Sequence, residues 1–287
     1  MQPAQADALA VQRNVIFGLL LGLAAAAWAL LVWQATGTDM DMATPTMGMR
    51  APLFLTVWAV MMVAMMFPTA APMILTFHKV QASKRARGEA FVSTWVFVAA
   101  YLLVWTLSGV AAYAGALATE EVAARTGLSP ATAARIGGAV LVVAGAYQLT
   151  PLKDLCLAKC RTPIGFIMTS WRDGAVGALR MGLLHGGYCL GCCWLLFVVL
   201  FPLGIMNIPA MAVITLIVFA EKTLRRGRLI ARGTAAALVV YGTVVMVAPR
   251  ALPTFMERGG MVMPTPAVSM DMQNMSMPGS AAAPSRK

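Results

Sequence analysis

Residues 181–203 read MGLLHGGYCLGCCWLLFVVLFPL, a run of 23 residues that contains no Asp, Glu, Lys or Arg. An α-helix needs about 20 apolar residues to cross the hydrocarbon core of a bilayer. This run is therefore long enough to be a transmembrane helix. A strand of a membrane β-barrel would instead alternate in hydrophobicity. The stretch predicts a helical membrane protein.

Other apolar runs repeat this pattern along the chain, so we predict an all-α, polytopic bundle of about seven transmembrane helices. The runs are residues 15–33, 52–76, 91–117, 131–149, 181–203, 205–220 and 234–248. The sixth run is short and follows the fifth directly, which indicates a tight hairpin or a partly re-entrant pair. The first run lacks a clear small-x-small cleavage site, so we expect an uncleaved anchor rather than a signal peptide.

Composition supports the membrane assignment. Of the 287 residues, 60% are hydrophobic and 11% are charged, and the mean hydropathy is +0.76. Soluble domains are typically about 45–50% apolar and about 25% charged. These values exclude a soluble enzyme, a disordered chain and a disulfide-stabilised secreted domain.

Basic residues predict the orientation of the spans. The loops after the second, fourth and sixth runs carry fourteen Lys and Arg residues, whereas the three opposite loops carry two. Cytoplasmic loops are enriched in Lys and Arg. We therefore expect a cytoplasmic N-terminus (residues 1–14), a membrane domain (15–249) and an external Met-rich tail (250–287). This asymmetry explains the net charge of +11 without a nucleic-acid partner.

The fifth run carries the strongest functional pattern. His185, Cys189, Cys192 and Cys193 are spaced i, i+4, i+7 and i+8, which places them on one face of a helix. Thiolates are soft ligands that favour Cu(I) or zinc over hard cations, and an ionisable group at membrane depth is a functional candidate. The alternative is that these cysteines only pack against a neighbouring helix.

Methionines of the second run form a second candidate group. Met61 and Met65, and Met62 and Met66, are two i, i+4 pairs near the expected midplane, so this cluster is predicted to face the Cys/His stripe. Methionine also fills gaps in apolar cores, and that alternative stays open. Two prolines that follow, Pro68 and Pro72, are expected to kink the helix.

A third group follows the fourth run. Thr150 is a plausible N-cap and Pro151 suits the first helical position, so a short helix is predicted there. It would present Cys156 and Cys160 on one face at the cytoplasmic surface. Such a pair suits a soft metal or a reducible disulfide, and the alternative is an interfacial helix whose cysteines only pack.

External methionines form the last group. Ten of the 22 methionines lie in two polar segments, where there is no core to fill. Thioethers need no deprotonation and suit Cu(I) outside the cell; compositional bias is the alternative. The residues that we expect to capture the ion are Met40, Met42, Met47, Met49, Met270, Met272, Met275 and Met277.

Three motifs carry a family resemblance. They are MMVAMMFPTAAPM at 61–73, YQLTPLKDLCLAKCRTP at 147–163, and HGGYCLGCCW at 185–194 followed by GIMN and the Glu221-Lys222 pair. Over residues 52–225 the chain resembles the DUF2182 family of predicted metal-binding integral membrane proteins. The resemblance implies a multi-pass protein of the bacterial inner membrane with a metal site. Phe197 stands where Met is expected, which removes one thioether.

Two functions of different class follow from these patterns. The first is a protein without catalytic activity that binds Cu(I), or alternatively zinc, for transport or for delivery to a cuproprotein client or a periplasmic copper carrier. The second is a membrane thiol-disulfide oxidoreductase, which would leave His185 and the methionines without a role. An accessory subunit without metal is a further alternative. The direction of transport and the oligomeric state stay open.

Overall fold

The computed structural model describes residues 3–37 and 44–254, and this part of the chain is helical without strands. The predicted all-α fold is therefore confirmed. The elements are α1 (Pro3–Gly37), α2 (Ala51–Ala86), α3 (Thr94–Thr126), α4 (Pro130–Tyr147), α5 (Pro151–Arg161), α6 (Pro163–Ser170), α7 (Gly174–Val198), α8 (Leu200–Leu203), α9 (Ile208–Thr223), α10 (Gly227–Val247) and the 3-10 turn η1 (Pro249–Ala251).

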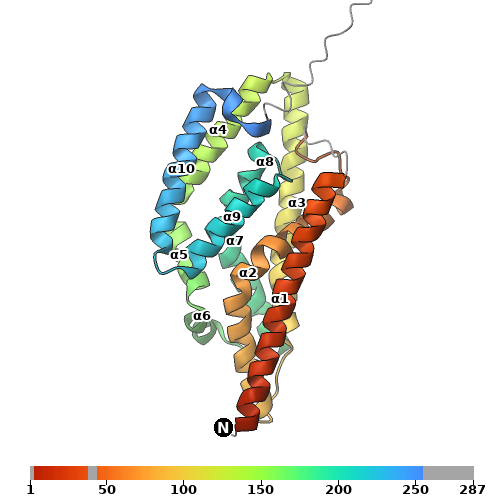
Figure 1. Cartoon of the computed structure of the whole chain (residues 1–287), viewed down its shortest axis with the longest axis vertical. Helices are drawn as coiled ribbons and strands as arrows, with labels where there is room; N and C mark the ends of the chain where they lie inside the picture. Colours follow the sequence, from red (N-terminus) through yellow and green to blue (C-terminus); the bar gives the residue numbers. More distant parts are fainter. Residues whose placement is uncertain (1–2, 38–43, 255–287) are drawn as a thin grey trace, which may run out of the picture.

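Within the described residues, six helices are long and apolar enough to cross a membrane, consistent with a multi-pass membrane protein. They correspond to six of the seven predicted runs. The remaining run is α9, which has 16 residues and falls short of a full span. Residues 204–207 reverse the chain ahead of α9, so α9 runs back beside α7 rather than continuing it (Figure 1).

Two helix groups lie side by side in the bundle. Helix α2 packs against α1, α3 and α9, whereas α4 pairs closely with α10. Helix α7 lies between these groups and packs against α3 and α5 (Figure 1). Gly182 permits the close α3–α7 approach, because a Cβ atom at that position would lie 2.5 Å from the Phe97 carbonyl oxygen.

The start of α5 has a clear local cause. Thr150 accepts a hydrogen bond from the Lys153 amide at 3.3 Å, and Pro151 occupies the first turn of α5. This confirms the predicted short helix and its cap. Pro68 and Pro72 lie inside α2.

Two lysines that were counted among the loop charges are buried, which corrects that part of the sequence interpretation. Lys153 is fully buried and Lys222 is 8% exposed. They face the protein interior because α5 and the end of α9 fold against α7. Without them the ratio of basic residues between the two sets of loops is still twelve to two.

The helix directions make the predicted orientation testable. The start of α1 and the α2–α3 link lie at one end of the bundle, and the α3–α4 link and the end of α10 lie at the other (Figure 1). We expect alkaline phosphatase to be active when fused after residue 287 and inactive when fused after Arg228, because the enzyme folds only outside the cytoplasm. Immunoblots would control for expression, and the reverse pattern would overturn the orientation.

Candidate metal site

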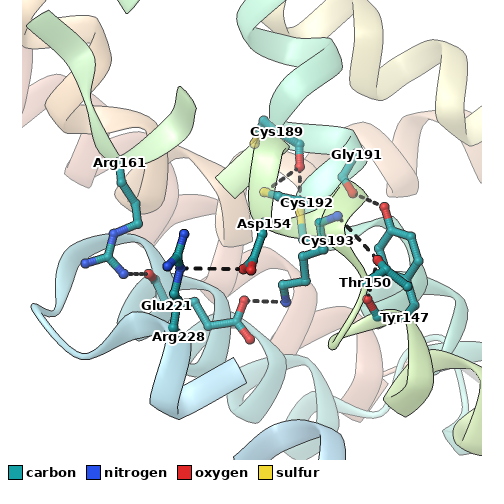
Figure 2. A network of polar contacts seen from close by, with 11 residues as sticks. Tyr147, Thr150, Asp154, Arg161, Cys189, Gly191, Cys192, Cys193, Glu221 and Arg228 are labelled. Atoms are coloured by element: carbon teal, nitrogen blue, oxygen red, sulfur yellow. Dashed lines mark hydrogen bonds and ion pairs between the residues drawn. The ribbon is translucent and has the colours of Figure 1, made fainter. Parts of the chain in front are cut away.

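The cysteines of α7 are directed to one side of the helix. The Cys192 and Cys193 thiols donate to the Cys189 carbonyl oxygen at 3.1 and 2.9 Å (Figure 2). All three residues are at most 1% exposed. These back-bonds hold both sulfur atoms on the side of the helix that Cys189 occupies, as the predicted stripe requires.

Cys189 is the centre of a polar network that joins three other helices. Its sulfur lies 3.1 Å from the Tyr101 hydroxyl of α3 and 3.0 Å from the Lys222 amine of α9. Lys222 also donates to the Thr69 hydroxyl of α2 at 3.4 Å. A cation therefore sits directly beside a thiol in the apolar interior.

The short helix α5 brings its cysteines to the same place. The Cys160 thiol interacts with the thiols of Cys189 and Cys192. The Lys222 ammonium is close enough to interact electrostatically with Cys160 and with all three cysteines of α7. Two cysteine groups that are separate in the sequence thus form one cluster around Lys222.

Cys156 lies one helical turn away, against Gly191. A Cβ atom at position 191 would lie 2.8 Å from the Cys156 sulfur, so glycine permits this contact. The Tyr147 hydroxyl donates to the Gly191 carbonyl oxygen (Figure 2). Burial raises the pKa of the Cys156 thiol, and neighbouring Cys192 raises it further. At neutral pH this thiol therefore keeps its proton.

Two charge contacts anchor α5 to the end of α9. The Lys153 amine donates to a Glu221 carboxylate oxygen at 2.7 Å, and both side chains are at most 2% exposed. Arg161 donates to the carbonyl oxygens of Glu221 and Leu224 at 2.9 and 2.7 Å. The second contact caps the C-terminal carbonyls of α9 (Figure 2). Together they fix Cys160 relative to Lys222.

His185 is buried among rings. It is 2% exposed, and its ring centroid lies 5.5 to 5.9 Å from the ring centroids of Phe97, Tyr101 and Phe166. Neither ring nitrogen has a hydrogen-bond partner among the residues that the structure describes. Buried polar atoms are normally satisfied, so an orphaned imidazole one turn from Cys189 calls for an explanation.

The methionine cluster of α2 reaches the cysteines indirectly. Met61, Met62, Met65 and Met66 are completely buried. The Thr69 hydroxyl lies 3.8 Å from the Met66 sulfur and also accepts from Lys222. Met66 is therefore connected to Cys189 through Thr69 and Lys222, whereas the α2 and α7 backbones are not close neighbours.

The external methionines are only partly described. Met47 and Met49 are 5% and 7% exposed, so they pack into the protein rather than project from a polar loop. Met40, Met42, Met270, Met272, Met275 and Met277 lie outside the described residues.

Several residues of the cluster escaped the sequence interpretation. Tyr101, Thr69 and Lys153 were not candidates, and Lys222 entered only as a loop charge and as part of a motif. One signal was available, because Lys222 and Glu221 directly follow an apolar run without any loop residue between.

The thiols are not arranged as a complete metal-coordination polyhedron. Across residues 3–37 and 44–254, no group of three or more His, Cys, Asp or Glu side chains is arranged so that it could hold a metal ion. A closed zinc site has four such ligands. What the cluster offers is a set of close thiols, a cation and an unsatisfied imidazole.

Comparison with known proteins points to copper. A family model described as PpoB2, copper chaperone, matches residues 55–245, from the first turns of α2 to the end of α10. No curated protein and no solved structure gives a significant match. The matched segment contains every described candidate ligand except Met47 and Met49, and it covers about two thirds of the chain. The chain belongs to the PpoB2 family of copper chaperones.

Proposed function

We propose that this protein binds Cu(I) as cargo within the bacterial inner membrane and delivers it to a cuproprotein client or a periplasmic carrier. The observation that carries the proposal is the burial of Lys222 among the thiols of α7 and α5. The copper-chaperone family supports copper as the ion. Soft sulfur ligands support its monovalent state.

Charge balance explains why a lysine suits this site. One Cu(I) held by two thiolates has a net charge of −1, and an uncompensated charge is costly in an apolar interior. The Lys222 ammonium, 3.0 Å from Cys189, would make the loaded site neutral. Zn(II) on the same two thiolates would be neutral by itself, so Lys222 would leave a surplus positive charge. The lysine therefore favours Cu(I) over zinc.

Each group of predicted ligands has a place in this scheme. Two of the three cysteines Cys189, Cys192 and Cys193 would hold the ion as thiolates while the third keeps its proton, and His185 would supply a further donor when its ring turns toward the metal. Cys160 and Cys156 would take the ion toward the opposite side of α7, and Met66 would serve the α2 side. Loading displaces thiol protons, so binding releases acid.

The direct test is a competition between metals. Protein purified anaerobically should take up Cu(I) in preference to Zn(II) when both are offered against chelators of known affinity. The bound metal is measured by elemental analysis of the desalted protein. A preference for Zn(II), or no retention of either ion by the folded protein, would overturn the proposal.

Lys222 offers a sharper test of the charge argument. Removing one member of a buried charge pair costs about 3–5 kcal/mol, so Lys222→Met should weaken Cu(I) binding by about 100-fold or more. Zn(II) affinity should stay the same or rise. Lys222→Arg keeps the charge and should recover part of the Cu(I) affinity. Equal losses for both metals would show that Lys222 acts only through packing.

Thiol-disulfide exchange is the second candidate, because Cys160 interacts with Cys189 and Cys192. All five cysteines are free in the structure. An oxidoreductase would cycle Cys160 between reduced and disulfide states in cells without a need for copper. Thiol alkylation of the protein in cells grown with and without copper would distinguish the two functions. In a chaperone the cysteines should be reduced and reactive without copper, and bound copper should protect them from alkylation.

A further inference from the structure

A large apolar groove lies between α3, α4 and α7. Its volume is about 1100 Å³. Aromatic side chains line much of it: Trp58, Trp105, Trp194, Phe197 and Phe201. The lining also includes Glu120 near the end of α3, Thr254, and Gly187 and Gly191 of α7. Gly191 also lies against the Cys156 sulfur, so the groove borders the cysteine cluster.

Described residues of the first Met-rich segment, and the last described residue before the second, line this groove. Met47 and Thr254 both line it. The Thr46 amide donates to a Glu120 carboxylate oxygen at 2.7 Å, and the Thr254 hydroxyl donates to the Pro202 carbonyl oxygen at 2.8 Å. The last described residue is thus anchored in the groove wall, and residues 255–287 continue from that point.

We propose that the groove between α3, α4 and α7 is the docking site of this chain's own Met-rich segment 255–287, which presents Cu(I) to the cysteines past Gly191. The inference rests on the proposed function for its cargo. The docking itself rests on where the described chain ends and on the shape and lining of the groove.

The chemistry of the segment suits the groove. Seven of its 33 residues are methionines. Methionine is apolar and flexible, and its sulfur makes favourable contacts with aromatic rings. The ligand groups can therefore enter an apolar groove that would exclude charged ligands, and a thioether needs no deprotonation to carry Cu(I).

The length of the segment is also sufficient. Along α3 the groove extends from Trp105 to Glu120, which is about 22 Å at the helical rise of 1.5 Å per residue. Met261 follows Thr254 by seven residues, which span up to about 25 Å when extended. Even the first methionines of the segment can reach Gly191, and the later ones reach it with slack.

Site-specific photocrosslinking tests this docking in the full chain, in lipid nanodiscs and without copper. The groove position is Ala111→benzoylphenylalanine on α3, with Ala133→benzoylphenylalanine on α4 as a second position should the first variant fail to fold. The matched control is Val110→benzoylphenylalanine, because Val110 is 50% exposed on α3 and is not part of the groove lining. Crosslinked peptides are identified by mass spectrometry.

We expect both groove positions to crosslink to residues 255–287 within a single chain, and the Val110 control to give no such crosslink. Crosslinks from the groove to phospholipid alone would show that acyl chains fill it and would overturn the inference. Crosslinks to a second copy, or none to residues 255–287, would overturn it as well. Because the crosslinking is done without copper, its outcome is independent of the metal competition. Crosslinks to residues 255–287 in a protein that fails to bind Cu(I) would overturn the proposed function but not the docking.

Discussion

Replacement of Cys189, Cys192 and Cys193 together by serine is expected to abolish tight binding at the proposed Cu(I) site. Each thiol is buried at the centre of the cluster, and a hydroxyl is a hard donor that Cu(I) binds poorly. Loss of outer-shell partners alone weakens metal binding by about 10–100-fold, so loss of three candidate ligands should exceed that range. Affinity is measured anaerobically by competition with a Cu(I) chelator.

The serine variant should keep the fold, because a serine hydroxyl can donate to the same backbone carbonyl as the thiol did. Val176→Ala is the matched control on α7, since Val176 is 81% exposed and lies outside the groove lining. It should bind Cu(I) like the unmodified protein. Equal affinity and stoichiometry in the triple variant would remove the cysteines of α7 from the mechanism.

Glu221→Gln should cause the largest loss of stability among single substitutions near the site. The change leaves the Lys153 ammonium buried without its partner, and removal of one member of a buried ion pair costs about 3–5 kcal/mol. We expect a clearly lower midpoint of denaturant unfolding in detergent. Maleimide labelling of Cys160 should also become faster, because α5 is no longer fixed to α9.

An exposed ion pair that joins the same two regions provides the control. Arg228 lies 3.8 Å from Asp154, and these side chains are 73% and 47% exposed. Exposed pairs contribute about 0–1 kcal/mol, so Asp154→Asn should leave unfolding and labelling nearly unchanged. Restoration of stability in the Lys153→Met/Glu221→Gln double variant would confirm that the lone charge is the cause. A stable Glu221→Gln variant would contradict it.

Local rules predicted much of the fold. Run length identified the spans, and the Thr150-Pro151 cap signal identified α5. Spacing also placed Cys189, Cys192 and Cys193 on one face, as the structure has them. These features depend on residues within a few turns of one another, so the sequence alone contains the needed information.

The remaining features of the site depend on tertiary contacts, which the sequence pattern does not show. Lys153 and Lys222 resembled loop charges because positive-inside counting considers sequence position and not burial. Their partners, Glu221 and Cys189, lie 68 and 33 residues away in the chain, and no local pattern links them. Tyr101 gave no signal, since a tyrosine in an apolar run is ordinary. Spacing placed His185 on the cysteine stripe, but whether its ring points at a ligand or at other rings is decided by α3 and α6.

The sequence separation of the Lys153–Glu221 pair also affects the order in which the site assembles during synthesis. Its members are 68 residues apart in the chain. Translation adds about 5–20 residues per second, so Glu221 is synthesised roughly 3–14 s after Lys153. During that interval the Lys153 ammonium would be an uncompensated charge in the apolar interior. We therefore expect α5 to pack fully against α7 only after α9 is inserted. A ribosome-bound chain that ends before α9 should therefore have Cys156 and Cys160 accessible to maleimide, although all five cysteines have already been synthesised.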